Sequence, residues 1–366
     1  MTRNKIFLVV TSLTFAIVIF ILNITVLSKP FFTNSLRQQK EEERDRKWRQ
    51  DQKSFPIPED AIKLQFEFSF PKKELEKEDI FLYQPFFLCS DKKGNIYVSD
   101  SRNHSILKFD SLGKFLKKIG RKGQGPGELS NPRYICCDDR NNLIVYDSNN
   151  RRIQIFSPEG EYLKNFKIFK RFCSMASDDQ GLIYASTNSM EGPLIEVLDR
   201  GGKLVNSFGE RIEFRHNTRS HNDVHISINT KGELFIAWQY FPIVRRYSKE
   251  GNLLSEYKVE YKLMRERAKP NYDVRMTGMG IKFFNIISGI RAKEDGFYLF
   301  SYYPRIEVLE INLNGEVSNI YWTDSPSFDY MGWDFVVKES AREKMFYILQ
   351  VFPEPKVEVF SSKTDS

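Results

Sequence analysis

The stretch KGNIYV at residues 93–98 is a turn followed by a short apolar strand, and the same pattern recurs along the chain. Small polar residues open the turn, and β-branched and aromatic residues follow it. The later copies are NNLIV from Asn141, GLIYA from Gly181, GELFI from Gly232, GFYLF from Gly296 and KMFYI from Lys344. Six copies of one strand signal indicate a repeat protein.

A second pattern, two strands joined by a glycine-containing turn, follows the first at a nearly constant distance. Its copies are ILKFDSLGKFLKKI from Ile106, IQIFSPEGEYLKNF from Ile153, IEVLDRGGKLVNSF from Ile195, VRRYSKEGNLLSEY from Val244 and VLEINLNGEVSNIY from Val308. Asp or Ser opens most of these turns, and Gly supplies the residue that needs a positive φ. The five turn glycines, Gly113, Gly160, Gly202, Gly251 and Gly315, are 47, 42, 49 and 64 residues apart.

A period in the forties with four strands per repeat predicts an all-β fold, a six-bladed β-propeller of four-stranded blades over residues 59–366. A TIM barrel or Rossmann sheet would need a helix in each repeat, and the repeats have no room for one. The sixth copy stops after residues 357–360 without an outer strand. Residues 62–70, IKLQFEFSF, alternate like a strand and have no local partner, so we expect them to close the last blade.

The first two repeats resemble NHL repeats. The resemblance rests on residues 100–109, DSRNHSILKF, and 147–156, DSNNRRIQIF, with their Asp, Asn and basic residues before a strand. The linker GRKGQGPGEL at residues 120–129, ending at Asn131-Pro132, is similar to the linker between NHL blades. The resemblance implies a six-bladed propeller but no single function, because such propellers include binding proteins and a few lyase-like or lactonase-like enzymes.

The N-terminal sequence predicts a membrane anchor or a signal peptide. A short tail, residues 1–5, precedes an uncharged stretch at residues 6–28, which as a helix would be about 34 Å long and could cross a bilayer. A cleaved signal peptide remains the alternative, although residues 26–28 match a cleavage site poorly. Residues 29–58 form a charged stalk or linker. We expect a single-pass membrane protein whose propeller lies on the extracytoplasmic side, periplasmic or extracellular.

The composition narrows the classes of function. Hydrophobic residues are 41% and aromatic residues 14%, enough for a large core, and the formal charge of +7 is a mild bias. No basic stripe follows the stalk, so we expect no nucleic-acid partner. The four cysteines, Cys89, Cys136, Cys137 and Cys173, lack zinc spacing. Buried free thiols, a bond between neighbouring blades and a vicinal Cys136–Cys137 bond all remain open.

Few sequence motifs indicate a catalytic or ligand-binding site. The glycine-rich segment at residues 120–128 lacks the G-K-[ST] ending of a phosphate loop and is interpreted as an inter-blade turn. His221, Asp223 and His225 would share one face of an innermost strand, where they could line the channel, contact an adjoining blade or hold a divalent metal. Arg133 and the basic insertion residues Arg265 and Arg267 complete the candidates for a binding face. No catalytic constellation is visible, and no cofactor is expected apart from that possible metal.

The sequence therefore favours a membrane-anchored extracytoplasmic scaffold that binds a protein, a peptide or a glycan. The alternative is a metal-dependent propeller hydrolase or lyase, lactonase-like, with its site in the central channel. Ligands from several blades that meet at one point would favour the enzyme, and an aromatic and basic face would favour binding.

Overall fold

The computed structural model describes residues 55–187, 189–213, 219–272, 284–325 and 331–363. The chain divides into two compact units, Met1–Pro56 and Ile57–Ser366, and the second unit contains the strands. The expected anchor at residues 6–28 and the stalk up to residue 54 lie outside the described residues. In the part that is described, no helix is both long and apolar enough to cross a membrane.

The strands of blades 1 to 3 follow one another along the chain, from the inner edge of each blade to its outer edge. Blade 1 contains β3 (Pro85–Ser90), β4 (Ile96–Asp100), β5 (Ser105–Phe109) and β6 (Phe115–Ile119). Blade 2 contains β7 (Pro132–Cys137), β8 (Leu143–Asp147), β9 (Arg152–Phe156) and β10 (Tyr162–Lys167). Blade 3 contains β11 (Phe172–Ser177), β12 (Ile183–Thr187), β13 (Ile195–Leu198) and β14 (Leu204–Phe208).

Blades 4 to 6 continue in the same way, and blade 6 takes its outer strand from the start of the chain. Blade 4 contains β15 (Val224–Ile228), β16 (Leu234–Trp238), β17 (Ile243–Tyr247) and β18 (Leu253–Lys258). Blade 5 contains β19 (Gly289–Ala292), β20 (Gly296–Ser301), β21 (Ile306–Asn312) and β22 (Val317–Thr323). Blade 6 contains β23 (Met331–Glu339), β24 (Lys344–Phe352), β25 (Lys356–Ser361) and β2 (Gln65–Phe70).

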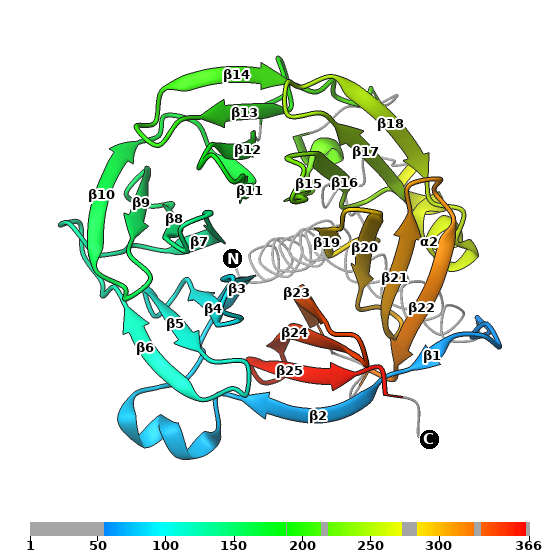
Figure 1. Ribbon diagram of the computed structural model, residues 1–366, viewed down its shortest axis with the longest axis horizontal. Helices are drawn as coiled ribbons and strands as arrows, with labels where there is room; N and C mark the ends of the chain where they lie inside the picture. Colours follow the sequence, from blue (N-terminus) through cyan, green and yellow to red (C-terminus); the bar gives the residue numbers. More distant parts are fainter. Residues whose placement is uncertain (1–54, 188, 214–218, 273–283, 326–330, 364–366) are drawn as a thin grey trace, which may run out of the picture. The chain divides into compact units, whose positions relative to one another are not determined.

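These six sheets, counted over the described residues, surround one axis (Figure 1). The inner strands β3, β7, β11, β15, β19 and β23 contact one another in that cyclic order, and β23 contacts β3. The predicted all-β propeller with six four-stranded blades is confirmed. Among the described residues, three short helices interrupt the pattern: the 3-10 helices η1 (Lys73–Glu78) and η2 (Arg219–Asn222), and α2 (Lys262–Tyr272).

The segment expected to be one strand over residues 62–70 is divided between two blades. β1 (Ile62–Lys63) pairs in parallel with β22 at the outer edge of blade 5. β2 pairs antiparallel with β25 and becomes the outer strand of blade 6. The two ends of the propeller chain therefore meet in one blade, so that β25 has a hydrogen-bonded neighbour on both sides.

The turn between the third and outer strands fits each blade against the preceding one. All five predicted turn glycines have positive φ values, between 77° and 92°. A Cβ at Gly113 would lie 2.8 Å from the Phe70 ring of blade 6, and one at Gly202 would lie 2.2 Å from the Phe166 ring of blade 2. Glycine is therefore required at these positions for two reasons, the backbone conformation and the side chain that packs against it.

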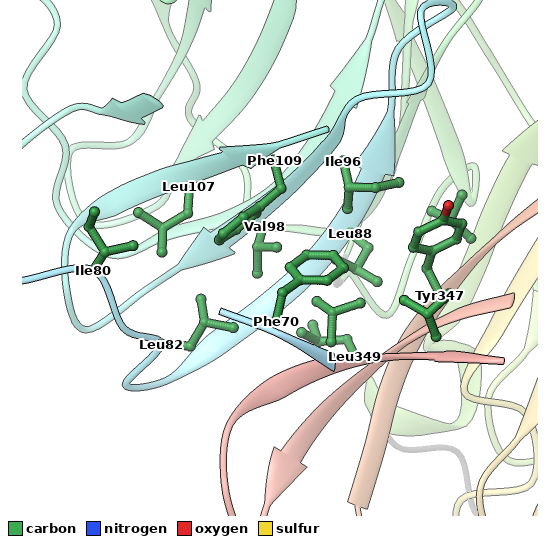
Figure 2. Packing of buried hydrophobic residues seen from close by; sticks show 13 residues of the cluster. Phe70, Ile80, Leu82, Leu88, Ile96, Val98, Leu107, Phe109, Tyr347 and Leu349 are labelled. Carbon is green, nitrogen blue, oxygen red and sulfur yellow. The ribbon is translucent and has the colours of Figure 1, made fainter. Parts of the chain in front are cut away.

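The core lies between the blades. Where blade 6 meets blade 1, the Phe70 side chain is fully buried and its ring centre is 4.7 Å from that of Phe109 (Figure 2). Val98 and Leu349 belong to the same cluster. Burying one such side chain stabilises a fold by about 2 kcal/mol. Blade closure is therefore also a packing interaction between the two ends of the propeller chain.

The glycine-rich segment at residues 120–129 lies in the connection from β6 to β7. The Arg152 guanidinium donates to the backbone carbonyls of Gln124, Gly125 and Glu128 at 2.8, 2.9 and 2.7 Å. Its Nε donates to Asp147 at 2.8 Å. One buried arginine thus satisfies the carbonyl groups of a connection that has little secondary structure of its own.

Candidate binding site

The strand-start face is defined here as the side of the ring on which the six inner strands begin, at Pro85, Pro132, Phe172, Val224, Gly289 and Met331. Because the sheets are antiparallel, the turns between the second and third strands lie on the same side. This face therefore gathers the starts of the inner strands, the connections that lead into them and one turn from each blade.

A row of aromatic side chains follows this face from blade 6 to blade 3. The ring centre of Phe86 lies 5.7 Å from Trp333 and 5.2 Å from Tyr134. Tyr134 stacks with Tyr146 at 6.5 Å, and Tyr146 contacts Phe172 at 5.3 Å. Neighbouring inner strands supply most of these rings, so the row joins four blades near the axis.

Arg133, a residue predicted for a binding face, lies against this aromatic row. Its guanidinium carbon is 4.9 Å from the centre of the Phe86 ring. Its Nε is buried and has no hydrogen-bond acceptor among the described residues. A buried donor without an acceptor costs about 1–3 kcal/mol.

A hollow of about 480 Å³ lies beside the row, between blades 2 and 3. Tyr146 belongs to both features. Three separate stretches line the hollow: Asn131, then Tyr146, Ser148, Asn149 and Arg151, then Ile168, Phe169, Lys170 and Arg171. These described lining residues include three cations and no carboxylate.

The cations of the hollow differ in their partners. Lys170 forms an ion pair with Glu196 of β13. Arg151 and Arg171 are exposed, and within the described part of the chain neither guanidinium makes a hydrogen bond or an ion pair. Phe169 is 93% exposed beside them. The hollow thus offers two exposed guanidinium groups, of which that of Arg171 also interacts electrostatically with Asp223, and an exposed aromatic ring.

The backbone at the hollow has two non-glycine residues in the left-handed region. Asn131 has φ 57° and Arg151 has φ 50°. The Asn131 N–H donates to His104 Nδ1 of blade 1 at 3.0 Å, and the Asn131 side chain donates to Ser148 Oγ at 3.0 Å. Burial lowers the pKa of His104, which keeps the ring neutral and able to accept this bond. Such conformations cost energy and mark a locally constrained region.

His221, Asp223 and His225 do not share one strand, so that part of the prediction is wrong. His221 belongs to η2, where its ring stacks with Phe241 at 6.1 Å. β15 begins only at Val224, so His225 alone of the three lies on the inner strand. The prediction relied on the alternation of side chains along a strand, and the 3-10 helix η2 interrupts that alternation before β15 begins.

The ionisation of these three groups reflects burial. Burial raises the pKa of Asp223 to about 6, although Arg171 acts in the opposite direction. Burial, with help from Arg291, lowers the pKa of His225 to about 4. Over the described residues, no three His, Cys, Asp or Glu side chains are grouped so that they could hold a metal ion.

The two arginines predicted in the insertion have different environments on α2. Arg265 is exposed and pairs with Glu260. Arg267 is buried, where it donates to Ser301 Oγ at 2.7 Å and to the Asn285 carbonyl at 2.6 Å. Burial lowers the pKa of Arg267 to about 10. Arg267 therefore ties the helix to blade 5 and is not available on the surface.

Sequence reasoning missed the residues of the hollow, above all Phe169, Lys170 and Arg171. A local signal exists: the connection between β10 and β11 places an aromatic residue directly before two basic ones. In the same connection Ile168 is buried in the core, whereas Phe169 is exposed, so the sequence alone does not show which of the two apolar residues faces solvent. The other half of the hollow comes from Asn131 and Arg151, which only the folded chain brings to it.

A family model describes most of the propeller. A domain of unknown function, DUF4934, matches residues 74–326. The chain belongs to the DUF4934 family. No curated protein matches the chain.

Solved structures share the fold of this DUF4934 protein at low sequence identity. A protein described as exported, from Bacteroides fragilis NCTC 9343, is 12% identical with a TM-score of 0.56, over 84% of this chain and 97% of that one. A DUF4221 family member from Bacteroides vulgatus ATCC 8482 is 14% identical with a TM-score of 0.51, over 82% and 98%. A streptogramin B lyase is 13% identical with a TM-score of 0.50, over 82% and 88%. At these identities the likeness shows the propeller fold alone.

Proposed function

We propose that this protein is an extracytoplasmic binding scaffold that holds a protein, peptide or glycan partner on its strand-start face. The partner presents carboxylate groups to the hollow between blades 2 and 3. The observation that supports this most is the pair Arg151 and Arg171, two exposed guanidinium groups beside the exposed ring of Phe169.

The chemistry of the hollow suits an anionic, partly apolar segment. Guanidinium groups bind carboxylates through two parallel hydrogen bonds, and no described lining carboxylate competes for them. The Asn131 side-chain amide already donates to Ser148 and Asn149, so it holds the rim of the hollow in place. Phe169 can cover an apolar side chain or a sugar face. An acidic peptide that carries apolar residues satisfies all of these groups.

The location is proposed from the N-terminal sequence. The apolar stretch at residues 6–28 supports a single-pass anchor, and the charged residues that follow it support a stalk. The similarity of the first two blades to NHL repeats stays a prediction, as do the absence of a cofactor and of a nucleic-acid partner.

The enzymatic alternative has no specific observation in its favour. A metal-dependent hydrolase or lyase would need ligands that converge, and η2 separates His221 from His225. The streptogramin B lyase shares the fold of this chain. Fold alone does not transfer an activity.

Binding of short acidic probes to the full-length protein tests the proposal. The probes are fluorescein-labelled hexaglutamate and a labelled uronic-acid hexamer, followed by fluorescence anisotropy at about 50 mM salt. We expect the double variant Arg151→Ala/Arg171→Ala to weaken binding by roughly 100-fold, since each charge-assisted contact contributes about 1.5 kcal/mol. Preference for one probe separates peptide from glycan.

The matched control is Arg140→Ala, which removes an exposed arginine from the turn between β7 and β8 of the same blade, on the opposite face. This variant should bind both probes like the wild type. Equal loss in the control and the double variant would indicate non-specific attraction to a basic protein. That result, or no binding of either probe, contradicts the proposal.

A further inference from the structure

Two cysteines from neighbouring inner strands lie in contact. Cys89 is on β3 of blade 1 and Cys137 is on β7 of blade 2. Their Sγ atoms are 3.8 Å apart, and both cysteines are free and half-buried. A disulfide has a sulfur–sulfur length of about 2.05 Å, so the gap to close is smaller than the length of one carbon–sulfur bond.

The other two cysteines lie elsewhere. Cys136 packs with Ile144 and Met175 in the cluster between blades 2 and 3. Cys137 points the other way and packs with Tyr97 in the cluster between blades 1 and 2, where Cys89 also lies. Successive residues of a strand face opposite sides, which explains the separation. Cys173 lies at the start of β11, where its thiol interacts with Asp223.

We propose that Cys89 and Cys137 form a disulfide that joins blades 1 and 2. This selects a bond between neighbouring blades from the alternatives that the sequence leaves open. The inference does not depend on the proposed binding function.

The oxidant is another disulfide, supplied by a thiol–disulfide oxidoreductase or by a small molecule such as oxidised glutathione. The Cys137 thiolate attacks one oxidant sulfur, which releases the first thiol and leaves a mixed disulfide. Cys89 then attacks the Cys137 sulfur and releases the second thiol. Two cysteine thiols are oxidised, one disulfide is reduced, and the two cysteine protons pass to the released thiols.

The environment sets the rate of this exchange. Burial and the neighbouring Cys137 raise the pKa of the Cys89 thiol, so little thiolate is present in the folded chain. We therefore expect slow oxidation of the folded protein, over hours, and faster oxidation during refolding. The second step, in which Cys89 acts as the nucleophile, is the slower one.

Peptide mapping of the full-length protein tests the inference. The reduced protein is kept with oxidised glutathione for a day, its remaining thiols are alkylated, and it is digested without reductant for mass spectrometry. We expect a peptide pair joined through Cys89 and Cys137, with alkylated Cys136 and Cys173. Fragmentation distinguishes Cys136 from Cys137, which share one tryptic peptide.

Two variants and one physical measurement complete the test. Cys136→Ser should keep the bond, and Cys137→Ser should lose it. Cys89 and Cys137 are 48 residues apart in the chain, so the disulfide would close a loop of that length and lower the entropy of the unfolded state. The oxidised wild type should therefore melt about 5 °C above the reduced form. Alkylation of all four cysteines after oxidation, or a bond through Cys136, would overturn the proposal even if a variant failed to fold.

Discussion

His225 shows how one buried side chain makes stability depend on pH. Both ring nitrogens are buried on the inner strand of blade 4. The folded chain therefore holds this ring neutral down to about pH 4, whereas the unfolded chain binds a proton near pH 6.5. The unfolded state takes up the proton first as the pH falls, and stability is lost between these two values.

We expect His225→Gln to remove this component, since glutamine does not titrate. Between pH 7 and pH 4.5, the wild type should lose about 2 kcal/mol more of its unfolding free energy than the variant. Urea denaturation at the two pH values measures the difference. Asp223, whose raised pKa acts with the opposite sign, is present in both proteins and cancels. Parallel loss in both proteins would show that His225 does not titrate as described.

At the scale of single elements, the turn between the third and outer strands is the unit that repeats. A polar residue opens the turn, and the N–H of the turn glycine returns to the carbonyl of that residue, as Gly202 does to Asp199 at 3.0 Å. Two constraints act at Gly202. Its backbone has a positive φ, and the Phe166 ring of the preceding blade occupies the place of a Cβ. Gly192 has a similar φ of 76°, but no atom would meet its Cβ.

Substitutions at Gly192 and Gly202 measure the cost of backbone strain separately from the cost of a packing clash. Gly192→Ala should cost about 1 kcal/mol, which is the strain of a left-handed alanine. Gly202→Ala should cost about 3 kcal/mol, because a clash with Phe166 is added to the strain. Equilibrium unfolding in urea compares the two variants, and Gly202→Ala/Phe166→Leu should recover part of the loss. Equal costs for the two single variants would contradict the packing argument.

The turn glycines also show what the sequence predicts well. The local sequence determines each hairpin, and the six copies of the strand pattern give the number of blades, so the propeller and its turns were predicted correctly. The prediction that His221, Asp223 and His225 share one strand face was wrong. The 3-10 helix η2 (Arg219–Asn222) precedes the strand, and its sequence contains no Gly or Pro that would indicate a break. The hollow could not be predicted from spacing, since Asn131, Arg151 and Arg171 come from three separate stretches around blade 2 and meet only in the folded chain.

For the propeller as a whole, the outer strand of blade 6 contributes to the closure of the ring. Phe70 is completely buried between blades 6 and 1, whereas Phe66 of the same strand is 58% exposed. Phe70 also lies against Gly113, so one ring contacts both the core cluster and a turn of blade 1.

Phe70→Ala should therefore destabilise the propeller by about 3 kcal/mol, the usual cost of deleting a buried aromatic side chain. Phe66→Ala, the matched control, should cost less than about 1 kcal/mol, because its ring is already largely in water. Thermal unfolding followed by circular dichroism compares them. Similar melting temperatures for the two variants would show that β2 does not contribute to closure through Phe70.

The pairing of β2 with β25 has a consequence for biosynthesis. Phe70 and Val357 are partners in the finished sheet, and 287 residues separate them in the chain. At about 5–20 residues per second, a ribosome needs roughly 15–60 s to make the second strand after the first. During that time the strand FEFSF at residues 66–70 has no partner. The nascent chain therefore carries an unpaired apolar strand until β25 has been synthesised.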